Sequence, residues 1–550
     1  RCNLTLPVQS GVNFVENLQV RQEFTQLENG EWALSEDDMI AEISVYGLLQ
    51  KAIVIRTTRL NDYAFDELPT KLFKGSARER READAMMRDE AFWKKYRAVE
   101  LSKSESSMSQ FVHRVEQMKG FKYVIFGLKA LIENFVETGG KDHPSKVDIG
   151  PVNTVFTRNF IDGFRTRISA QTTANLSKHW FLAGYMARGW GSKKNYYSGE
   201  LTYSFNKKEY LPREFPKRTV SFKSTYDIMS PSDKFLRTDK DNVFTSLKWT
   251  KVDKMMFYNR QQLTFEREEE WGMKTTLSLR TEENEAVGAL FFEKLSNPFP
   301  SIVYPDTDVS KLLHNGKLRT TELRFELEIA PGRTFINTKQ RRIAINLEAP
   351  VITLSHSMGL NGVLGGQYRY NFSEVGLLKR FWLRSWGKFD VQLYAGAQWD
   401  KVPFPLLIMP AANLSYIVQK GTFNLINNME FLNDRYASVD LGWDMNGKIF
   451  NRIPLIKKLK WREFIGFKGL WGSLTDKNNP LLLQNIGDET LMYFPEGSHV
   501  MNPKRPYMEI IVGVHNIFKL FHVQYVRRLN YNELNTARKQ GVRLMMRMSF

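Results

Sequence analysis

From Val147 to Phe550 the chain alternates between apolar and polar residues, in segments of roughly ten residues that clusters of Gly, Asn, Asp and Pro separate. In one segment the first parity is entirely apolar: Phe389, Val391, Leu393, Ala395, Ala397 and Trp399. The other parity consists of Asp390, Gln392, Tyr394, Gly396 and Gln398. Because successive side chains of a strand point to opposite faces, this pattern predicts β-strands with one apolar and one polar face.

Two environments produce such strands: a soluble antiparallel sheet with one wet face, or a barrel in a membrane. The barrel is favoured because the pattern continues to the last residue and because Trp, Tyr and Phe lie near segment ends, as in interfacial girdles. The final segment is the most specific signal. Its apolar face consists of Val542, Leu544, Met546, Met548 and the terminal Phe550. We expect Phe550, Met548 and Met546 to form a C-terminal signal of the kind that outer-membrane assembly machinery recognises.

The fold class predicted is therefore all-β, a transmembrane antiparallel β-barrel of about 16 strands, since single-chain bacterial barrels have even strand numbers. The segment 243–250 is the weakest of the predicted strands and is expected to be no strand. The predicted strands are 147–157, 160–171, 177–188, 195–205, 217–228, 243–250, 254–266, 272–285, 318–330, 342–357, 366–377, 386–399, 435–447, 461–473, 506–516, 518–529 and 541–550.

The first 144 residues differ from the rest of the chain. Residues 1–72 are predicted to be part of a small β-rich periplasmic region, and residues 73–144 a mainly helical periplasmic linker or plug, before the barrel at 145–550. Ala77–Arg97 and Glu105–Met118 are the expected helices. Three loops, 297–316, 403–434 and 475–505, are long enough to be functional or extracellular segments.

Composition narrows the function classes. The formal net charge is +18, from 78 Lys and Arg against 60 Asp and Glu, but the basic residues are dispersed, so nucleic acid is not the expected partner. A polar lumen and loops that face the outer-membrane bilayer and its lipopolysaccharide explain the charge. No apolar run is long enough for a spanning helix, since Phe121–Val136 contains Lys122, Lys129 and Glu133. The single cysteine, Cys2, excludes an intrachain disulfide and a Cys-ligated zinc site.

Several stretches together resemble the Bacteroidetes outer-membrane barrels of unknown function, the DUF5686 family, which usually carry an N-terminal carboxypeptidase-regulatory-like domain. The matching stretches include Val147–Gly150, Asp162–Arg165, Leu176–His179, Glu214–Pro216, Met429–Phe431, Asn516–Lys519, Tyr525–Leu529 and Gly541–Arg543. The resemblance covers roughly residues 75–550. It implies that the chain lacks the regulatory-like domain at its N-terminus. It also implies kinship with 16-stranded surface-antigen barrels that insert or translocate proteins and lipids, although their Arg-Gly-Phe loop motif has no counterpart here.

Two groups of residues are candidate sites. Asn159, Asp162, Gly163 and Arg165 surround an Asp-Gly turn and are expected to close a periplasmic hairpin between the first two strands; the alternative is a gate or lumen-binding role. Glu430, Asp434 and Arg435 are expected to form a lumen-facing ion pair that fixes the loop 403–434, and the alternative is ligand binding.

Catalysis and metal binding are not expected. No histidine has a metal-ligand spacing, and His515 and His522 belong to neighbouring strands, so neither a metal nor another cofactor is predicted. Ser177 and His179 share a strand face, but i and i+2 side chains lie roughly 6.5 Å apart, too far for a nucleophile and its base.

The expected function is that of an outer-membrane transport or assembly component, acting through its lumen or by opening at the seam between the first and last strands. The alternatives are a structural barrel that anchors an N-terminal periplasmic domain, and an outer-membrane lipid hydrolase.

Overall fold

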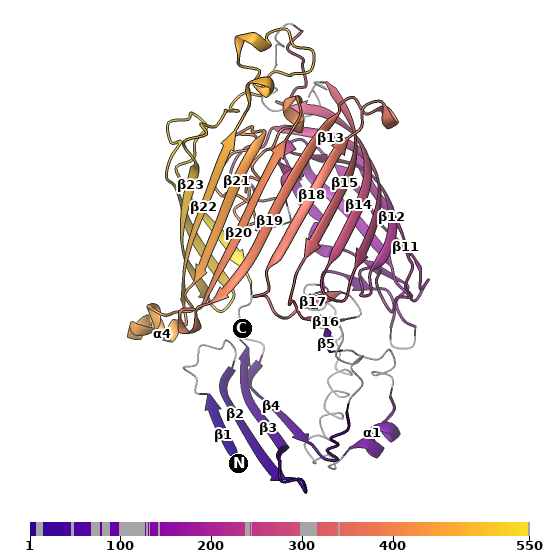
Figure 1. Ribbon diagram of the computed structural model, residues 1–550, viewed down its shortest axis with the longest axis vertical. Coiled ribbons are helices and arrows are strands. Elements are labelled where there is room, and N and C mark those ends of the chain that lie inside the picture. The colour runs from indigo at the N-terminus through magenta and orange to yellow at the C-terminus, as the bar shows by residue number, and fades with distance from the viewer. Residues whose placement is uncertain are drawn as a thin grey trace.

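The protein is described by a computed structural model that covers residues 1–6, 15–45, 49–67, 77–79, 88–97, 127, 130, 133–140, 143–236, 243, 245–297, 316–338 and 341–547. Its main body is a closed antiparallel barrel (Figure 1). The order of strands in the wall follows the sequence, as expected for hairpins between neighbours. The strands are β7 (Val147–Ile149), β8 (Phe156–Asn159), β9 (Gly163–Thr172), β10 (Trp180–Gly189), β11 (Asn195–Ser204), β12 (Arg218–Met229), β13 (Lys254–Glu268), β14 (Lys274–Gly288), β15 (Lys317–Ile329), β18 (Val351–Gly359), β19 (Tyr370–Trp382), β20 (Lys388–Gln398), β21 (Arg435–Asp444), β22 (Arg462–Ser473), β23 (Tyr507–Ile517), β24 (Phe521–Arg528) and β25 (Gln540–Met546), with the two-residue β6 (Val136–Glu137) beside β7.

The first strand is interrupted. β7 and β8 both pair with β9, and a short 3-10 turn, Val152–Thr154, lies between them. Counted as one strand, and without β6, they give a barrel of 16 strands, which confirms the predicted fold class. Of the described residues in 243–250 none belongs to a strand, as expected, and Lys248 forms an isolated β-bridge with Ser415. The predicted strand 342–357 was too long, since it divides into β17 (Arg342–Ala344) and β18.

The two faces of the wall follow the predicted parity. Outward side chains are large and apolar, and Ile168 and Met186 are 76% and 73% exposed. Inward side chains are polar, and Asp227, Asn284 and Glu509 are fully buried. An apolar outer wall around a polar interior is the arrangement of a membrane-spanning barrel. None of the described helices is long and apolar enough to cross a membrane.

The two ends of the barrel differ. The N-terminal region and the last residues of β25 lie at one end, which we call the terminal end (Figure 1). The four longest connections are β12–β13, β14–β15, β20–β21 and β22–β23. The strand ends that they join all lie at the opposite end, which we call the long-loop end. Chain direction requires this, because alternate turns of an antiparallel wall lie at the same end.

The N-terminal region contains a four-stranded antiparallel sheet in the order β1 (Cys2–Leu6), β2 (Val15–Gln26), β3 (Trp32–Val45), β4 (Leu49–Arg59). A short helix, α1 (Glu90–Tyr96), begins at Asp89, whose side chain accepts a 2.8 Å hydrogen bond from the Phe92 N–H. Of the two expected helices, 105–118 lies outside the described residues. The start of the other was wrong, because β5 (Ala77–Glu79) pairs in parallel with β16 (Phe335–Asn337) below the barrel. An open strand edge there overrides the local helix preference.

The parity of the wall gives a first prediction. Leu393→Arg places a charge on the lipid side of the middle of β20 and should cost about 2–4 kcal/mol of barrel stability, whereas Gln392→Arg points into the lumen and should be tolerated. Heat-modifiability on gels of detergent-extracted membranes measures this. The compact unheated band should be lost or destabilised for Leu393→Arg alone; equal loss in both variants would contradict the assignment of faces.

Candidate functional site

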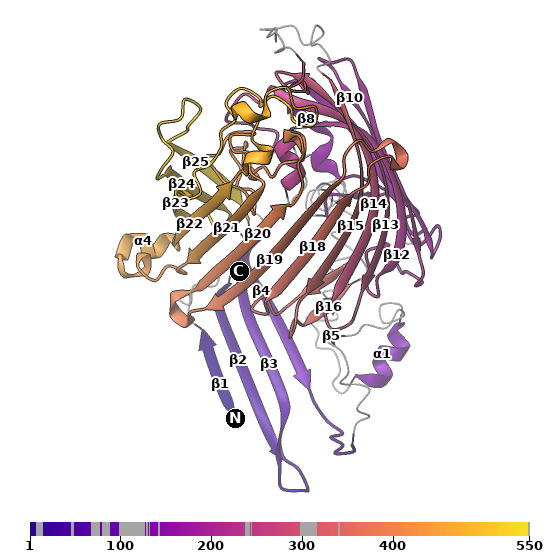
Figure 2. The same ribbon diagram turned by 45° about the horizontal axis from the view of Figure 1, so that its top comes forward.

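The lumen is filled by the connection between β20 and β21, residues 399–434, which we call the plug. Figure 2, in which the long-loop end comes forward, shows orange chain of this region lying within the ring of strands. Val402, Leu407, Leu425, Ile426 and Leu432 of the plug are fully buried. They belong to clusters with inward residues of the wall, among them Met256, Ala286, Leu318, Leu470, Tyr507, Ile511 and Val526. The loop expected at 403–434 is therefore an internal element.

One carboxylate of the wall holds the plug through backbone groups. Glu509 of β23 accepts hydrogen bonds from Asn424 N at 3.0 Å, Asn424 Nδ2 at 2.9 Å and Leu425 N at 3.2 Å. Tyr507 OH donates to the same carboxylate at 2.9 Å. On the other side of this turn Arg543 of β25 donates to the Asn424 carbonyl. A buried carboxylate with several donors is well satisfied, so this contact fixes the position of the plug.

A buried ion pair holds the C-terminal part of the plug. Arg528 of β24 lies 2.8 Å from Glu430, and both side chains are fully buried. The Arg528 guanidinium also lies over the ring of Tyr507, at 4.9 Å from its centroid. Glu430 receives a second bond from Asn427 N at 2.8 Å.

The next loop, 474–506, closes over the plug from the long-loop end. Asp488 of this loop forms an ion pair with Lys401 of the plug. Burial opposes ionisation of Asp488, but the Lys401 ammonium and the N–H groups of Leu491 and Thr490 together lower its pKa below the ordinary value. A carboxylate whose pKa is lowered by folding stabilises the folded state at any pH above its pKa in the unfolded chain. This stabilisation is lost as the pH falls through the pKa of the folded state, so the link between Asp488 and Lys401 is intact at neutral pH.

The seam of the barrel is completed by loop segments. β25 pairs with β24 on one side. On its other side Leu544 N donates to the Tyr416 carbonyl and Val418 N donates to the Leu544 carbonyl, both at 2.8 Å. Ile417 is the bridge partner of Leu544, so this part of the plug lies beside β25 as a piece of the wall.

A second loop segment continues from the plug to the first strand. Tyr416 N donates to the Leu247 carbonyl at 3.1 Å, and Val243 N donates to the Asn153 carbonyl at 2.8 Å in the interruption between β7 and β8. In the sheet order of the described residues, the two-residue β6 is the one strand between β25 and β7. The seam thus has short strands and loop-supplied hydrogen bonds, in contrast to the 15-residue β13 and β14.

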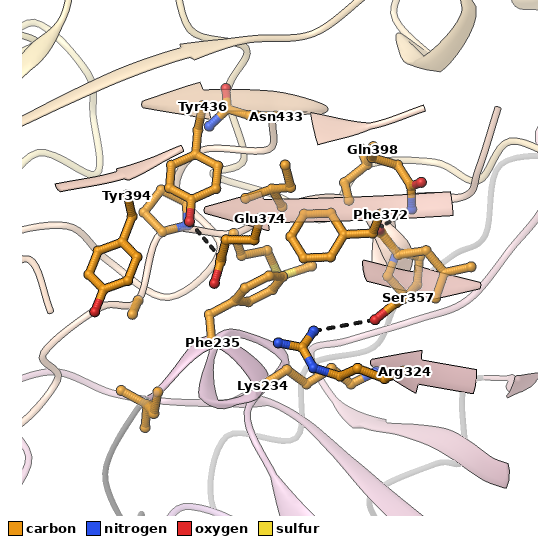
Figure 3. Close-up of a pocket in the computed structure, with 18 of the residues that line it drawn as sticks. Lys234, Phe235, Arg324, Ser357, Phe372, Glu374, Tyr394, Gln398, Asn433 and Tyr436 are labelled. Carbon is orange, nitrogen blue, oxygen red and sulfur yellow. Dashed lines mark hydrogen bonds between the residues drawn. The ribbon is translucent and has the colours of Figure 1, made fainter. Parts of the chain in front are cut away.

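A polar cavity of about 550 Å³ remains between the plug and the wall (Figure 3). Ion pairs line it: Arg280 Nη2 lies 3.0 Å from Glu322 Oε1, and Lys234 Nζ lies 3.4 Å from Glu282 Oε1. Tyr436 OH donates to Glu374 at 2.6 Å and Arg324 donates to Ser357 at 3.3 Å, as Figure 3 shows. Because these charges are paired with each other, the cavity suits water or a polar solute better than a single strongly charged ligand.

Comparison with known proteins identifies the family. The model for the C-terminal domain of a family of unknown function, DUF5686, matches residues 138–479, more than half of the chain. The chain belongs to this family. The resemblance inferred from the sequence is thereby confirmed. No curated protein matches the chain.

Two solved structures are similar to this DUF5686 chain. BamA from Haemophilus ducreyi lacking POTRA domains 1-3 has 8% identity and a TM-score of 0.41, with 77% of this chain and 78% of that chain covered. CdiB from Acinetobacter baumannii has 12% identity and a TM-score of 0.33, with 71% of this chain and 57% of that chain covered. Neither similarity supports an inference about function.

The predicted hairpin residues divide into two sites in this DUF5686 barrel. Asn159 Oδ1 accepts from Asp162 N at 2.7 Å, and the Asp162 carboxylate accepts from Tyr196 OH and Ser192 Oγ of the adjacent hairpin, both at 2.5 Å. Gly163, with φ of 61°, provides the left-handed turn. The hairpin lies at the long-loop end, opposite the N-terminal region. The prediction that the hairpin and the N-terminal region share one side of the barrel was therefore wrong. The first strand crosses the barrel before its first turn.

Arg165 is not part of the turn. Its guanidinium forms a two-pronged pair with Asp227 of β12, with distances of 2.6 and 3.0 Å, and lies 4.7 Å from the centroid of the Tyr196 ring. Tyr185 OH donates to the same carboxylate. This network ties β9 to β10, β11 and β12 inside the lumen, and nothing in the sequence shows the pairing of two residues 62 positions apart.

The ion pair predicted among Glu430, Asp434 and Arg435 does not form. Glu430 pairs with Arg528 instead. Asp434 accepts from Thr475 N and Asn478 Nδ2, both at 3.0 Å, and so joins the plug to the loop 474–506. Arg435 begins β21 with the outward parity and is exposed. The prediction was wrong because Arg435 has the same parity as the outward residues Ala437 and Val439, whereas Glu430 and Asp434 lie in the plug.

The candidate catalytic and metal residues are placed as follows. Ser177 Oγ accepts from Trp180 N at 3.1 Å and His179 Nδ1 lies 2.7 Å from the Ser204 carbonyl, so the two side chains are engaged elsewhere. His515 Nε2 lies 3.0 Å from Gln524 Nε2. Among the described residues there is no cluster with the composition of a metal site. Of the C-terminal signal, Met546 is exposed on the outer wall, and Met548 and Phe550 lie outside the described residues.

The buried pair gives a second prediction. Arg528→Gln leaves Glu430 as an unpaired buried charge and should lower the free energy of unfolding by about 3–5 kcal/mol. The control Arg527→Gln changes the adjacent arginine, whose side chain is exposed on the outer wall, and should have little effect. Urea titration in detergent, followed by tryptophan fluorescence, measures both. The double variant Glu430→Gln with Arg528→Gln should recover part of the stability lost in Arg528→Gln. Identical unfolding midpoints for Arg528→Gln and Arg527→Gln would show that the buried pair does not stabilise the fold.

Proposed function

We propose that the protein is an outer-membrane transport or assembly component that works by opening at its seam. The observation that carries this proposal is that the seam is completed by hydrogen bonds from the plug at Tyr416 and Val418, instead of a full-length pairing between the first and last strands. A lumen filled by buried plug residues is unsuited to free diffusion of solutes, so passage requires that the plug and the wall separate.

The location in the outer membrane is part of the proposal. The apolar outer wall, the antiparallel closure and the polar interior support it. With the N-terminal region and C-terminus on the periplasmic side, the long-loop end faces the lipopolysaccharide. The assembly machinery is the expected partner during biogenesis, and no catalytic activity or cofactor is proposed.

The plug would be released at the turn 422–425, where its polar contacts with the wall are concentrated. Glu509, Arg543 and Lys468 all bind backbone atoms of residues 422–425, and Lys468 Nζ lies 2.7 Å from the Thr422 carbonyl. Backbone contacts are lost together when this one turn moves. Releasing it also removes the partners of Leu544, because Tyr416 and Val418 belong to the same plug.

A second function is favoured by a different observation, the dense packing of the plug. Met256, Leu407 and Leu432 are fully buried in one cluster, as in a permanently closed barrel. Such a barrel would anchor the N-terminal sheet in the membrane without passing anything.

A reversible lock distinguishes the two functions. In a Cys2→Ser background, Ile417→Cys with Leu544→Cys places two thiols on bridge partners at the seam. We expect the oxidised double variant to abolish opening events in planar bilayers and to lose complementation of the envelope defect of a deletion strain, with both restored by reductant.

Each single-cysteine variant is the control and should behave as the Cys2→Ser parent. Full complementation by the oxidised, demonstrably cross-linked double variant would overturn the opening mechanism and favour the anchor.

A further inference from the structure

A second cavity, of about 610 Å³, lies on the outer wall of the barrel across β15, β18, β19, β20 and β21. We call it the outer groove. Its outward side chains are Phe325, Leu354, His356, Ser373, Val375, Ala395, Ala397, Trp399 and Arg435. Most of them are apolar, and the few polar ones gather at one end.

Small side chains create the depression. On β20 the outward residues change from Leu393 to Ala395 and Ala397 before Trp399, and Ala395 is paired with another outward alanine, Ala437 of β21. The larger residues Phe325, Leu354 and Val375 line the opposite side of the groove. On a membrane-facing wall such a depression forfeits dispersion contacts unless a lipid chain fills it.

The polar end of the groove is built by a cross-strand contact. His356 and Ser373 are direct partners in the β18–β19 register, and His356 Nδ1 lies 2.9 Å from Ser373 Oγ. Trp399 Nε1 donates to the same hydroxyl at 2.9 Å. The serine therefore holds the indole of Trp399 at the rim, where aromatic side chains of barrels meet the headgroup region.

A cation lies at the same end. Arg435 starts β21 opposite Ala397 of β20, at the long-loop end of the wall. Within the described part of the chain its exposed guanidinium makes no ion pair. Arginine binds phosphate through two parallel hydrogen bonds, and an unpaired outward arginine above an apolar groove is suited to an anionic headgroup on an acyl chain.

We propose that the outer groove binds a phosphate-bearing acyl lipid of the leaflet at the long-loop end, with one acyl chain over Ala395 and Ala397 and the phosphate at Arg435. This rests on the membrane location proposed above. In an outer membrane the lipid of that leaflet is lipopolysaccharide, which is the occupant we expect, and a phospholipid is the competing one.

Native mass spectrometry of barrels extracted in mild detergent tests the proposal. Wild-type protein should retain lipopolysaccharide. Ala395→Leu fills the groove and should lose it, as should Arg435→Gln. The matched controls are Ala170→Leu, an outward alanine of β9, and Arg188→Gln, an outward arginine at the long-loop end of β10, and both should retain the lipid.

Retention of phospholipid alone, or equal retention by groove variants and controls, overturns the proposal. A folded variant is recognised by its heat-modifiable band, so loss of lipid is not confused with misfolding. Absence of that band from the membrane fraction of wild-type cells would instead refute the membrane location, which separates failure of the two proposals.

Discussion

A barrel wall in lipid must satisfy every backbone N–H and C=O group within the protein, because the hydrocarbon supplies no partner. The long strands β13 and β14 meet this condition over 15 residues each. The seam does not meet it with strands alone. There the edge of β25 is satisfied by the plug through Tyr416 and Val418, and the plug is joined in turn to Leu247. The plug thus both fills the lumen and completes the wall, so movement of the plug opens the wall at the seam.

Buried charges decide where the plug sits. Glu430, Arg528 and Glu509 are fully buried charges. A buried ion pair stabilises a protein little more than an apolar contact would, but removing one of its two partners is strongly destabilising. Such contacts specify one position of the plug against the many that a purely apolar packing would allow. The Arg165–Asp227 pair likewise specifies one arrangement of the wall strands β9 and β12, on the side of the first strand that faces away from the seam.

The sequence predicted the features that depend on local periodicity and missed those that depend on register. The parity of Phe389–Trp399, the strand number and the exclusion of 243–250 follow from period-2 alternation. The Arg165–Asp227 and His356–Ser373 contacts join separate strands, and a one-residue slip changes every such pairing. The Glu430–Arg528 pair joins the plug to β24, and local periodicity does not predict such a long-range contact. The plug was missed because its apolar residues lie in a segment without periodicity. The end of the barrel at which the first hairpin lies could have been predicted, since a strand that starts at the terminal end must turn at the long-loop end.

If the barrel opens at the seam, the seam must be the least stable part of the wall. Hydrogen–deuterium exchange of the protein in lipid nanodiscs measures this most directly, through the amides of Val418 and Leu544 against those of the central residues of β13 and β14. We expect the two seam amides to exchange together and much faster than the β13 and β14 amides. Equal protection of the seam and of these long strands would contradict this expectation.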